Sequence, residues 1–487
     1  MIKKIALFIT LSLFALLTLI LYRAYNFTPA PAATLTAEAL APQQNELLPS
    51  PEVIATHLSQ AIQFRTISHE QKASSASTEF TAFIDWLAKT YPLLHQQFSL
   101  QRLNDYTLLY KWQGKQSDRA VLLSAHYDVV PVTGESDWTY PPFDGMIAED
   151  YIWGRGALDD KSAAIALMEA ATLLLSSGFQ PEQDIYIALT HDEEIGSQNG
   201  ARAVAEQLRS NAVNVAWSLD EGSFVLDGMI PGITTPVASI NVAEKGYLTL
   251  ELVAHGQGGH SSMPPQETAV SILAAAIVKL KENPVPGGLE GLSKEMYLNL
   301  GKHMDFGKRI LFANTWLFKP VIESVMGSLP SGNAMLRTTT APTMLSGSVK
   351  ANVLPTIATA KVNFRLHPRD SVASLTEWVR TVIDDDRIDI NAIQPAEASA
   401  ISSSTEQGFI QIAQQARRVH GDVIVVPGLT IAATDSRYYG QITNAYRFNP
   451  MVIDNQDLAG FHGINERISI DNMTKAVSFY IGLMRSQ

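Results

Sequence analysis

The chain has 487 residues, of which 46% are hydrophobic and 17% are charged, and its formal net charge is -12. This composition is typical of a folded protein with about two domains, and it excludes a largely disordered chain. No run of Lys or Arg follows the first few residues, so the sequence predicts no binding to nucleic acid. Because cysteine is absent, any bound metal must be held by histidine and carboxylate side chains.

The first segment predicts insertion into a membrane. Lys3 and Lys4 precede an uncharged apolar run, residues 5–22, and Arg23 follows it. The run is close to the ~20 residues that a spanning helix needs and exceeds the ~7–15 of a signal-peptide core. The basic residues are expected to stay in the cytoplasm, so residues 1–23 would anchor an exported catalytic part, as on a bacterial inner membrane facing the periplasm.

A cleaved signal peptide is the alternative for this segment. Ala30-Pro31-Ala32 resembles a small-residue cleavage site, and cleavage there would give a secreted protein. Both alternatives export the remainder of the chain. A linker rich in Pro and Ala, residues 24–50, separates the segment from the first predicted helix.

Helices and short apolar strands follow the linker. Helical periodicity marks residues 51–64, 77–90, 161–176 and 197–209, and apolar runs predict strands at residues 120–125, 185–190, 215–219 and 423–426. Continuous apolar runs are typical of strands that are buried on both faces. An α/β catalytic domain with a largely parallel sheet is therefore expected.

A different order of elements begins near residue 244. Strand, helix, strand, strand, helix and strand are predicted at residues 246–254, 265–282, 344–353, 357–366, 372–383 and 388–393. This is the order of a ferredoxin-like α+β unit. We therefore expect an inserted lid or dimerisation domain, residues 244–395, between two parts of the catalytic domain, residues 51–243 and 396–487. Residues 283–336 are expected to add helices packed on the insert, and a helix at about residues 472–484 ends the chain.

Acidic and imidazole side chains follow three of the predicted strands. His126 and Asp128 come after the first, Glu193 and Glu194 after the second, and Asp220 after the third. Because ligands bind outside the carboxyl ends of strands in open α/β sheets, these side chains are expected to share one rim.

Two further segments add groups of the same kind. Asp159 and Asp160 lie in a turn that opens a helix, and His462 lies in a loop near the C-terminus. Carboxylate and imidazole donors without sulfur suit Zn²⁺, for which Co²⁺ or Mn²⁺ can substitute. Each residue alone has a structural alternative, such as a helix cap for Asp159. Together they favour two metal ions that share a carboxylate.

The sequence resembles the zinc aminoacylase and carboxypeptidase family, and most of all its carboxypeptidase S-like branch. The motifs that carry the resemblance occur in the family's order from about residue 52 to residue 487: SAHYDVVP, WTYPPFDG, WGRGALDDK, THDEEIG, LDEG, GGHSSMPP, NVLP, ATDSRYY and FHGINE. The resemblance implies two zinc ions per subunit. One would be held by His126, Asp159 and Asp220, and the second by Asp159, Glu194 and His462.

The same resemblance implies the catalytic roles. Glu193 would be the general base, and Asp128 would orient His126 by contacting the imidazole and not the metal ion. The peptide bond between Asp159 and Asp160 is often cis in the family.

Substrate contacts also come from the resemblance. His260, on the inserted domain, would polarise the scissile carbonyl. Asn352 and Arg365 would hold the carboxylate of the substrate, a role that suits a guanidinium group. Asp435 and Arg437 would belong to a loop beside the substrate, which here follows two alanines where the family commonly has two glycines.

The expected reaction is hydrolysis of an amide that releases a C-terminal free amino acid from a small peptide or an N-acyl amino acid. An N-fatty-acyl-amino-acid hydrolase or synthase is the alternative. A catalytically silent solute-binding relative is less expected, because Glu193 and the five ligands are all present. The lid domain is expected to allow a homodimer.

Overall fold

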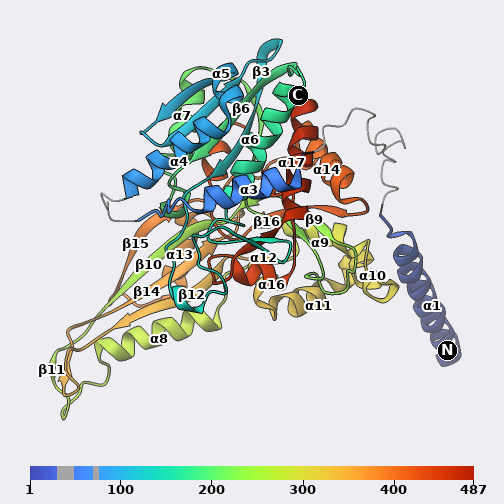
Figure 1. Cartoon of the computed structure of the whole chain (residues 1–487). Coiled ribbons are helices and arrows are strands. Elements are labelled where there is room, and N and C mark those ends of the chain that lie inside the picture. Colours follow the sequence, from blue (N-terminus) through green and yellow to red (C-terminus); the bar gives the residue numbers. More distant parts are fainter. Residues whose placement is uncertain (30–48, 70–75) are drawn as a thin grey trace.

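A mixed ten-stranded sheet forms the centre of the larger domain (Figure 1). The computed structural model describes residues 1–29, 49–69 and 76–487, so Ala30-Pro31-Ala32 and most of the predicted linker lie outside the described residues. The paired order is β1 (Ser99–Leu103), β2 (Thr107–Trp112), β6 (Gln183–Thr190), β3 (Gln116–His126), β7 (Val215–Asp220), β17 (Asn444–Arg447), β9 (Val237–Glu244), β8 (Val225–Leu226) and β18 (Val452–Ile453), with β16 (Ile424–Thr430) on β9.

The four central strands, β6, β3, β7 and β17, run parallel, which confirms the largely parallel sheet. Successive side chains of a strand point to opposite faces. Along β3, Leu123 and Ala125 therefore enter one hydrophobic cluster, whereas Leu122 enters another on the opposite face. Burial on both faces explains why the sequence of this strand is continuously apolar.

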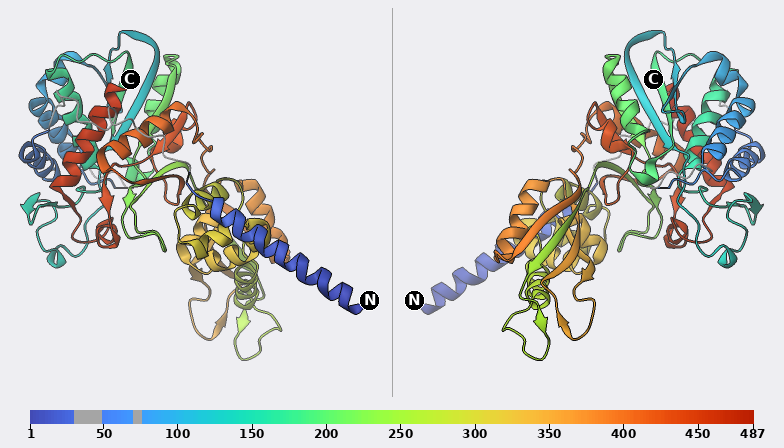
Figure 2. Two further views of the ribbon diagram at one scale, coloured as in Figure 1. Left: turned by 90° about the vertical axis from the view of Figure 1, so that its right-hand side faces the viewer. Right: turned by 90° about the vertical axis from the view of Figure 1, so that its left-hand side faces the viewer.

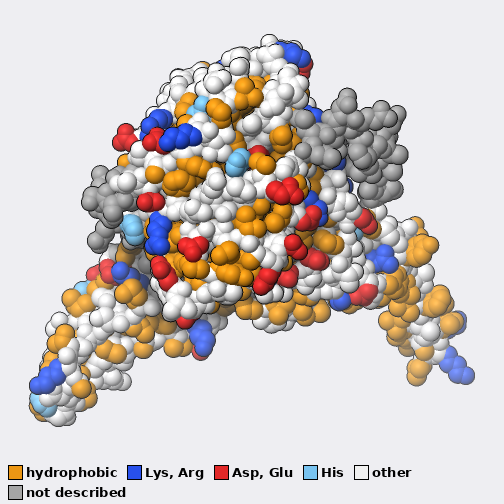
Figure 3. All heavy atoms as spheres, in the orientation of Figure 1, with side chains coloured by type: hydrophobic (Ala, Val, Ile, Leu, Met, Phe, Trp, Pro, Cys, Tyr) orange, Lys and Arg blue, Asp and Glu red, His pale blue; other side chains and the backbone are white. Residues whose placement is uncertain are grey.

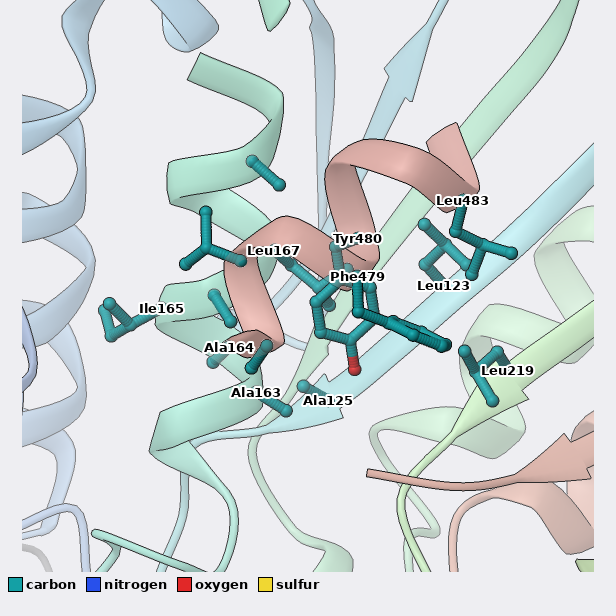
Figure 4. Packing of buried hydrophobic residues seen from close by; sticks show 14 of the residues in the cluster. Leu123, Ala125, Ala163, Ala164, Ile165, Leu167, Leu219, Phe479, Tyr480 and Leu483 are labelled. Carbon is teal, nitrogen blue, oxygen red and sulfur yellow. The ribbon is translucent and has the colours of Figure 1, made fainter. Parts of the chain in front are cut away.

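Helices cover both faces of the sheet (Figures 1 and 2). Figure 4 shows the packing on one face, where Leu167 and Tyr480 belong to the same buried cluster as Leu123 and Leu219 of the sheet. The helices of this domain are α3 (Pro51–Ile62), α4 (Ala76–Thr90), α5 (Pro92–Gln97), α6 (Lys161–Ser176), α7 (Ala201–Ser210), α14 (Gln407–His420), α15 (Ser436–Tyr439), α16 (Asn455–Gly460) and α17 (Ile470–Arg485), with 3₁₀ turns η1 (Glu135–Asp137) and η2 (Glu193–Ile195).

A small sheet joins two segments that are far apart in the sequence. Its strands are β4 (Met146–Ala148), β5 (Tyr151–Trp153) and β19 (Arg467–Ser469). Because Ile152 of β5 pairs with Ile468 of β19, the segment after β5 lies beside the segment before β19. Asp159 and His462 belong to these two segments.

The inserted domain has the predicted ferredoxin-like order. Its antiparallel sheet pairs as β12 (Thr339–Ser346), β14 (Ile357–Leu366), β10 (Gly246–His255) and β15 (Ile388–Ala396), and α8 (Ala269–Glu282) and α13 (Val372–Ile383) pack on it. The strand predicted at residues 344–353 is misplaced. It begins at Thr339, passes a bulge near Pro342 and ends at Ser346 before a turn. A hairpin of β11 (Gly259–His260) and β13 (Val353–Leu354) forms the far end.

The chain passes between the two domains at two neighbouring points. Tyr247, at the start of β10, pairs with Ala396, at the end of β15. On the catalytic side, the Ser399 N–H donates to the Glu244 carbonyl at 3.1 Å, and the Ser399 hydroxyl accepts the Glu244 N–H at 2.9 Å. These two crossings lie side by side, and residues 283–336, which follow α8 and precede β12 of the lid, connect the domains a second time.

Residues 283–336 form helices, as predicted, namely α9 (Gly291–Gly301), α10 (Phe306–Ala313), α11 (Thr315–Gly327) and α12 (Pro330–Leu336). We expected these helices to pack on the inserted domain, and this expectation is wrong, because their main contact is with the catalytic domain. Their core includes Val237 of β9 with Ile424 and Val426 of β16, all in the catalytic domain. The apolar side chains of this edge of the sheet would be exposed without these helices.

Helix α1 (Ile2–Asn26) contains the N-terminal apolar run, with a mean hydropathy of 2.5 over a window of which 0% is buried. Among the described helices it alone is long and apolar enough to cross a membrane. A signal sequence meets the same criterion, so both alternatives for this segment remain consistent with export.

Candidate metal centre

Three neighbouring parallel strands bring acidic and imidazole groups to one rim, as predicted. His126 is the last residue of β3 and Asp220 the last of β7, while η2, with Glu193 and Glu194, follows β6 between them in sequence. His126 and Asp220 are buried, at 1% and 2% exposure. The rim therefore lies inside the protein, where solvent screens charges weakly.

Asp159 lies between two imidazole rings. Its Oδ1 is 2.9 Å from Nε2 of His126, and its Oδ2 is 2.9 Å from Nε2 of His462. Nε2 of His462 is also 3.3 Å from Oε2 of Glu194. Each carboxylate oxygen of Asp159 thus faces a different imidazole.

Two overlapping groups of side chains have ligand atoms within 4.8 Å of one another. One group is His126, Asp159 and Glu194, and the other is His126, Glu193 and Glu221. Glu221 was missed by the sequence reasoning, although LDEG places it directly after Asp220. Asp220 belongs to neither group, and its role as a ligand stays a prediction.

Burial raises the pKa of most of these carboxyl groups. It raises the pKa of Glu194 to about 7, with a contribution from the charge of Asp159, and the pKa of Asp220 to about 6. Burial also raises the pKa of Glu193 and Glu221 well above their ordinary value. The protein thus stabilises the charged forms of these acids poorly by itself.

The two histidines and Asp159 show the opposite effect. Burial disfavours the charge of Asp159, but hydrogen bonds to His126 and His462 outweigh it and lower the pKa of Asp159. Hydrogen bonds to Asp159 and Glu194 raise the pKa of His462 to about 10. The site therefore attracts positive charge.

The donor set fits divalent cations. Among the described residues, Oε1 of Glu194, Oδ2 of Asp160 and both carboxylate oxygens of Asp220 are buried without a hydrogen-bond partner. Buried oxygens of this kind are normally satisfied, so they indicate a missing partner. Oxygen and nitrogen donors without sulfur suit Zn²⁺, Co²⁺ and Mn²⁺.

Asp128 connects two parts of the rim. Its Oδ1 is 3.4 Å from Nδ1 of His126, and the same nitrogen lies 3.0 Å from the backbone carbonyl of Asp128. Its two oxygens also accept the backbone N–H groups of Glu193 and Glu194, each at 3.2 Å, and Oδ2 accepts the hydroxyl of Ser68 at 2.6 Å. One buried carboxylate thus fixes both the imidazole and the turn that carries the glutamates.

Glu466 holds the loop that carries Asp159, and sequence reasoning missed this role. Its carboxylate accepts backbone N–H groups from Gly156, Leu158 and Asp159 at 2.7–3.1 Å and pairs with Arg155 at 2.6 Å. The Asp159–Asp160 peptide bond is cis, as the resemblance implied. Glu466 was within reach of sequence reasoning, because it is the acid of FHGINE.

Arg365 and Arg437, predicted to bind substrate, lie close enough to interact. Burial and the charge of Arg437 lower the pKa of Arg365. The guanidinium of Arg365 lies 5.1 Å from the centre of the Tyr247 ring, and no described acid pairs with it. Asp435 is instead buried, accepting the hydroxyl of Thr190 at 2.5 Å, which places its carboxylate inside the domain.

His260 and Asn352 lie together but away from the metal ligands. They are neighbours at the far end of the lid, where the Ser261 N–H donates to the Asn352 carbonyl at 3.3 Å. Figure 1 shows this end, marked β11, remote from the sheet of the catalytic domain. His260 is exposed and its Nδ1 lies 2.8 Å from the Ser262 hydroxyl. Within one chain, the structure does not bring His260 to Glu193.

Comparison with known proteins decides the family. The model of peptidase family M20/M25/M40 matches residues 122–486. The chain belongs to this peptidase family. It is a hydrolase, and peptidases of this family depend on metal ions.

Relatives of the chain share most of its length. A probable carboxypeptidase S-like 2 of Dictyostelium discoideum is 39% identical over 440 residues, covering 89% of this chain and 85% of the relative. The N-fatty-acyl-amino acid synthase/hydrolase PM20D1 of Mus musculus is 40% identical, covering 86% and 84%. The metallo-carboxypeptidase Sso-CP2 of Sulfolobus solfataricus has the same fold, with a TM-score of 0.65, 19% identity and coverage of 89% and 98%.

The loop contacts of Glu466 generate a first prediction. Glu466→Gln is expected to lower metal affinity by about 10–100-fold, because an amide cannot accept all of these N–H groups and Asp159 loses its fixed position. Bound metal is measured by elemental analysis during titration with a chelator. Glu206→Gln, in an exposed pair with Arg202, is the matched control and should change nothing. Unchanged affinity in Glu466→Gln would contradict the positioning role.

Glu221 generates a second prediction. If its carboxylate is the ligand that follows β7, Glu221→Gln should leave one metal ion per chain, whereas Asp220→Asn should keep two. Elemental analysis of both variants after dialysis checks this. Loss of metal in Asp220→Asn with full content in Glu221→Gln would restore Asp220 as the ligand.

Proposed function

We propose that this chain is a two-zinc hydrolase that cleaves the amide between an acyl or peptidyl group and a free amino acid. The observation that carries this proposal is Asp159, whose two oxygens lie 2.9 Å from two different imidazoles. His126 and Asp159, with Asp220 or Glu221, would hold one ion. Asp159, Glu194 and His462 would hold the other.

Glu193 is the proposed general base. A bound divalent ion supplies Lewis-acid chemistry, which polarises a carbonyl and lowers the pKa of water. Glu193 accepts the proton of the attacking water and returns it to the leaving nitrogen. Burial raises the pKa of the Glu193 carboxyl above its ordinary value, which makes its carboxylate a stronger proton acceptor.

The proposed site for the substrate carboxylate is Arg365, with Arg437 beside it. Two neighbouring guanidinium groups repel each other, and a bound carboxylate removes that repulsion. Because only the C-terminal residue of a peptide has a free α-carboxylate, this requirement favours release of a C-terminal amino acid over cleavage at the N-terminus. Asn352, at the lid tip, remains a candidate contact to the same substrate.

The substrate class has two candidates. Carboxypeptidase S-like relatives favour small peptides, and the N-fatty-acyl-amino acid synthase/hydrolase favours N-acyl amino acids with fatty chains. Turnover of a panel that pairs dipeptides with short- and long-chain N-acyl amino acids, with zinc present, distinguishes them. Full activity after exhaustive chelation, with metal absence verified, would contradict the two-zinc proposal.

We further propose that α1 retains the chain in the membrane, with the catalytic domain on the outer side, and that a homodimer forms through the lid. The dimer is favoured by β12, an edge strand of the lid sheet whose last six residues are exposed. An exposed edge strand presents unpaired N–H and C=O groups to which a strand of another chain can add. A second copy would also supply His260, which lies remote from the metal ligands of its own chain.

The two neighbouring glutamates generate a third prediction. Glu193→Gln keeps size and polarity but cannot accept a proton, so turnover should fall by at least ~10²-fold with metal content unchanged. Glu194→Gln should instead lose metal, because a neutral amide is a weak ligand. Initial rates and bound zinc are measured on both. The roles are reversed if Glu193→Gln loses zinc while Glu194→Gln keeps both zinc and activity.

Arg365 generates a fourth prediction. Arg365→Ala should raise KM for substrates with a free carboxylate by about 10–100-fold, the value of a charge-assisted hydrogen bond. Substrates amidated at that carboxyl should bind the variant and the parent protein equally. Arg380→Ala, which removes an exposed ion pair with Glu377 on the same domain, is the control. An equal effect on both substrate types would contradict the assignment.

The proposed dimer generates a fifth prediction. His260→Ala alone should lower turnover by about 10²–10³-fold, the effect of removing one donor to the developing oxyanion. Mixing His260→Ala chains with Glu193→Gln chains should restore roughly a quarter of the parent activity, because half of the symmetric dimers then contain one complete site. Failure of the mixture, with chain exchange verified, would show that His260 does not act across the dimer.

A further inference from the structure

Helix α11 presents an apolar face to solvent. Trp316, Leu317, Val321 and Val325 are 54%, 41%, 49% and 56% exposed. Their spacing of about four residues puts them on one side of the helix, and exposed Leu329 follows shortly after its end. In Figure 3, hydrophobic side chains gather along the lower edge of the molecule, in the region of α11.

The charged side chains of α11 lie elsewhere and are paired. Nζ of Lys319 is 2.6 Å from Oε1 of Glu290 and 3.7 Å from Oε1 of Glu323. Oε1 of Glu323 accepts the Leu289 N–H at 2.7 Å. A surface helix of a soluble protein normally turns its charged side to water and its apolar side to the core. Here Lys319 and Glu323 pair with neighbouring protein segments, Lys319 remaining 39% exposed, and the exposed side with Trp316 carries no charge.

The apolar face begins where α1 joins the body of the protein. Asn314, which directly precedes α11, donates through Nδ2 to the Ile20 carbonyl at 3.1 Å, and Arg23 donates through Nε to the Ala313 carbonyl at 3.1 Å. Ile20 is buried in this contact. Because Ile20 lies near the end of the apolar run of α1, α11 starts at the level where that run ends (Figure 2).

We propose that the apolar face of α11 lies on the lipid surface of the membrane that α1 crosses. Trp316 would lie at the interface, which tryptophan favours, and the aliphatic side chains would enter the boundary of the acyl chains. The proposal rests on retention of α1 in the membrane, as proposed above. Contacts of both α1 and α11 with the membrane would fix the orientation of the catalytic domain above the bilayer.

The absence of cysteine permits a direct test on the full-length chain. A single engineered cysteine carries an environment-sensitive fluorophore, and the protein is reconstituted in vesicles of phosphatidylcholine and phosphatidylglycerol with brominated acyl chains. Val325→Cys reports on α11, Leu13→Cys on α1, and Ser210→Cys on the exposed end of α7. We expect blue-shifted emission and quenching by the brominated lipids for the first two labels and neither effect for the third.

The outcomes separate this inference from the proposed anchor. A label at residue 325 that stays in water while the label at residue 13 is quenched overturns the inference and leaves the anchor intact. Quenching at neither position contradicts both. Shielding at residue 325 that depends on protein concentration and not on lipid bromination identifies a second copy of the chain as the occupant and also overturns the inference.

A charge variant adds a check in the same system. Leu317→Asp together with Val321→Asp, in the Val325→Cys chain, should abolish quenching at residue 325, because carboxylates are expelled from the acyl region. The same double substitution should leave quenching of a label at residue 13 unchanged. Metal content verifies that the variant is folded. Quenching at residue 325 that survives both charges would overturn the inference.

Discussion

The arrangement of the metal centre depends on one buried carboxylate, that of Asp159, held between His126 and His462. The two imidazoles come from segments more than 300 residues apart in sequence, so the contact requires the sheet, the loop after β5 and the C-terminal segment to be in place together. Glu466 secures that loop through backbone N–H groups, and β19 pairs with β5 beside it. Burial of several acids would otherwise destabilise the fold, since each charge loses its hydration.

A second buried carboxylate, Glu244, ties the substrate side to the catalytic sheet. Its Oε2 accepts the Thr434 hydroxyl at 2.7 Å and pairs with Arg447 at 2.9 Å. Arg447 is fully buried and aligned with Asp220 on the neighbouring strand, so its charge offsets part of the acidity near the rim. The loop that carries Arg437 thus begins at a fixed point of the catalytic domain.

Much of the architecture could be predicted from the sequence, because buried parallel strands are continuously apolar and the order of elements is specific to the inserted unit. The convergence of His126, Asp159, Glu194 and His462 was also predictable. The sequence could not predict whether Asp220 or Glu221 of LDEG faces the cluster, because neighbouring side chains at the end of a strand point in opposite directions. The position of His260 depends on how the lid is oriented, and the packing of α9–α12 on β16 depends on tertiary contacts that leave no periodic signal.

The position of Arg365 in the lid has a mechanical consequence. All of the metal-ligand candidates belong to the catalytic domain, whereas Arg365 belongs to the lid and pairs with Tyr247 at the junction between the two domains. Because Arg365 lies at the junction, rotation of the lid about it would move the distant hairpin of β11 and β13 far more than Arg365. A change of lid angle would therefore alter the surroundings of His260 and leave Arg365 and the metal-ligand candidates nearly in place.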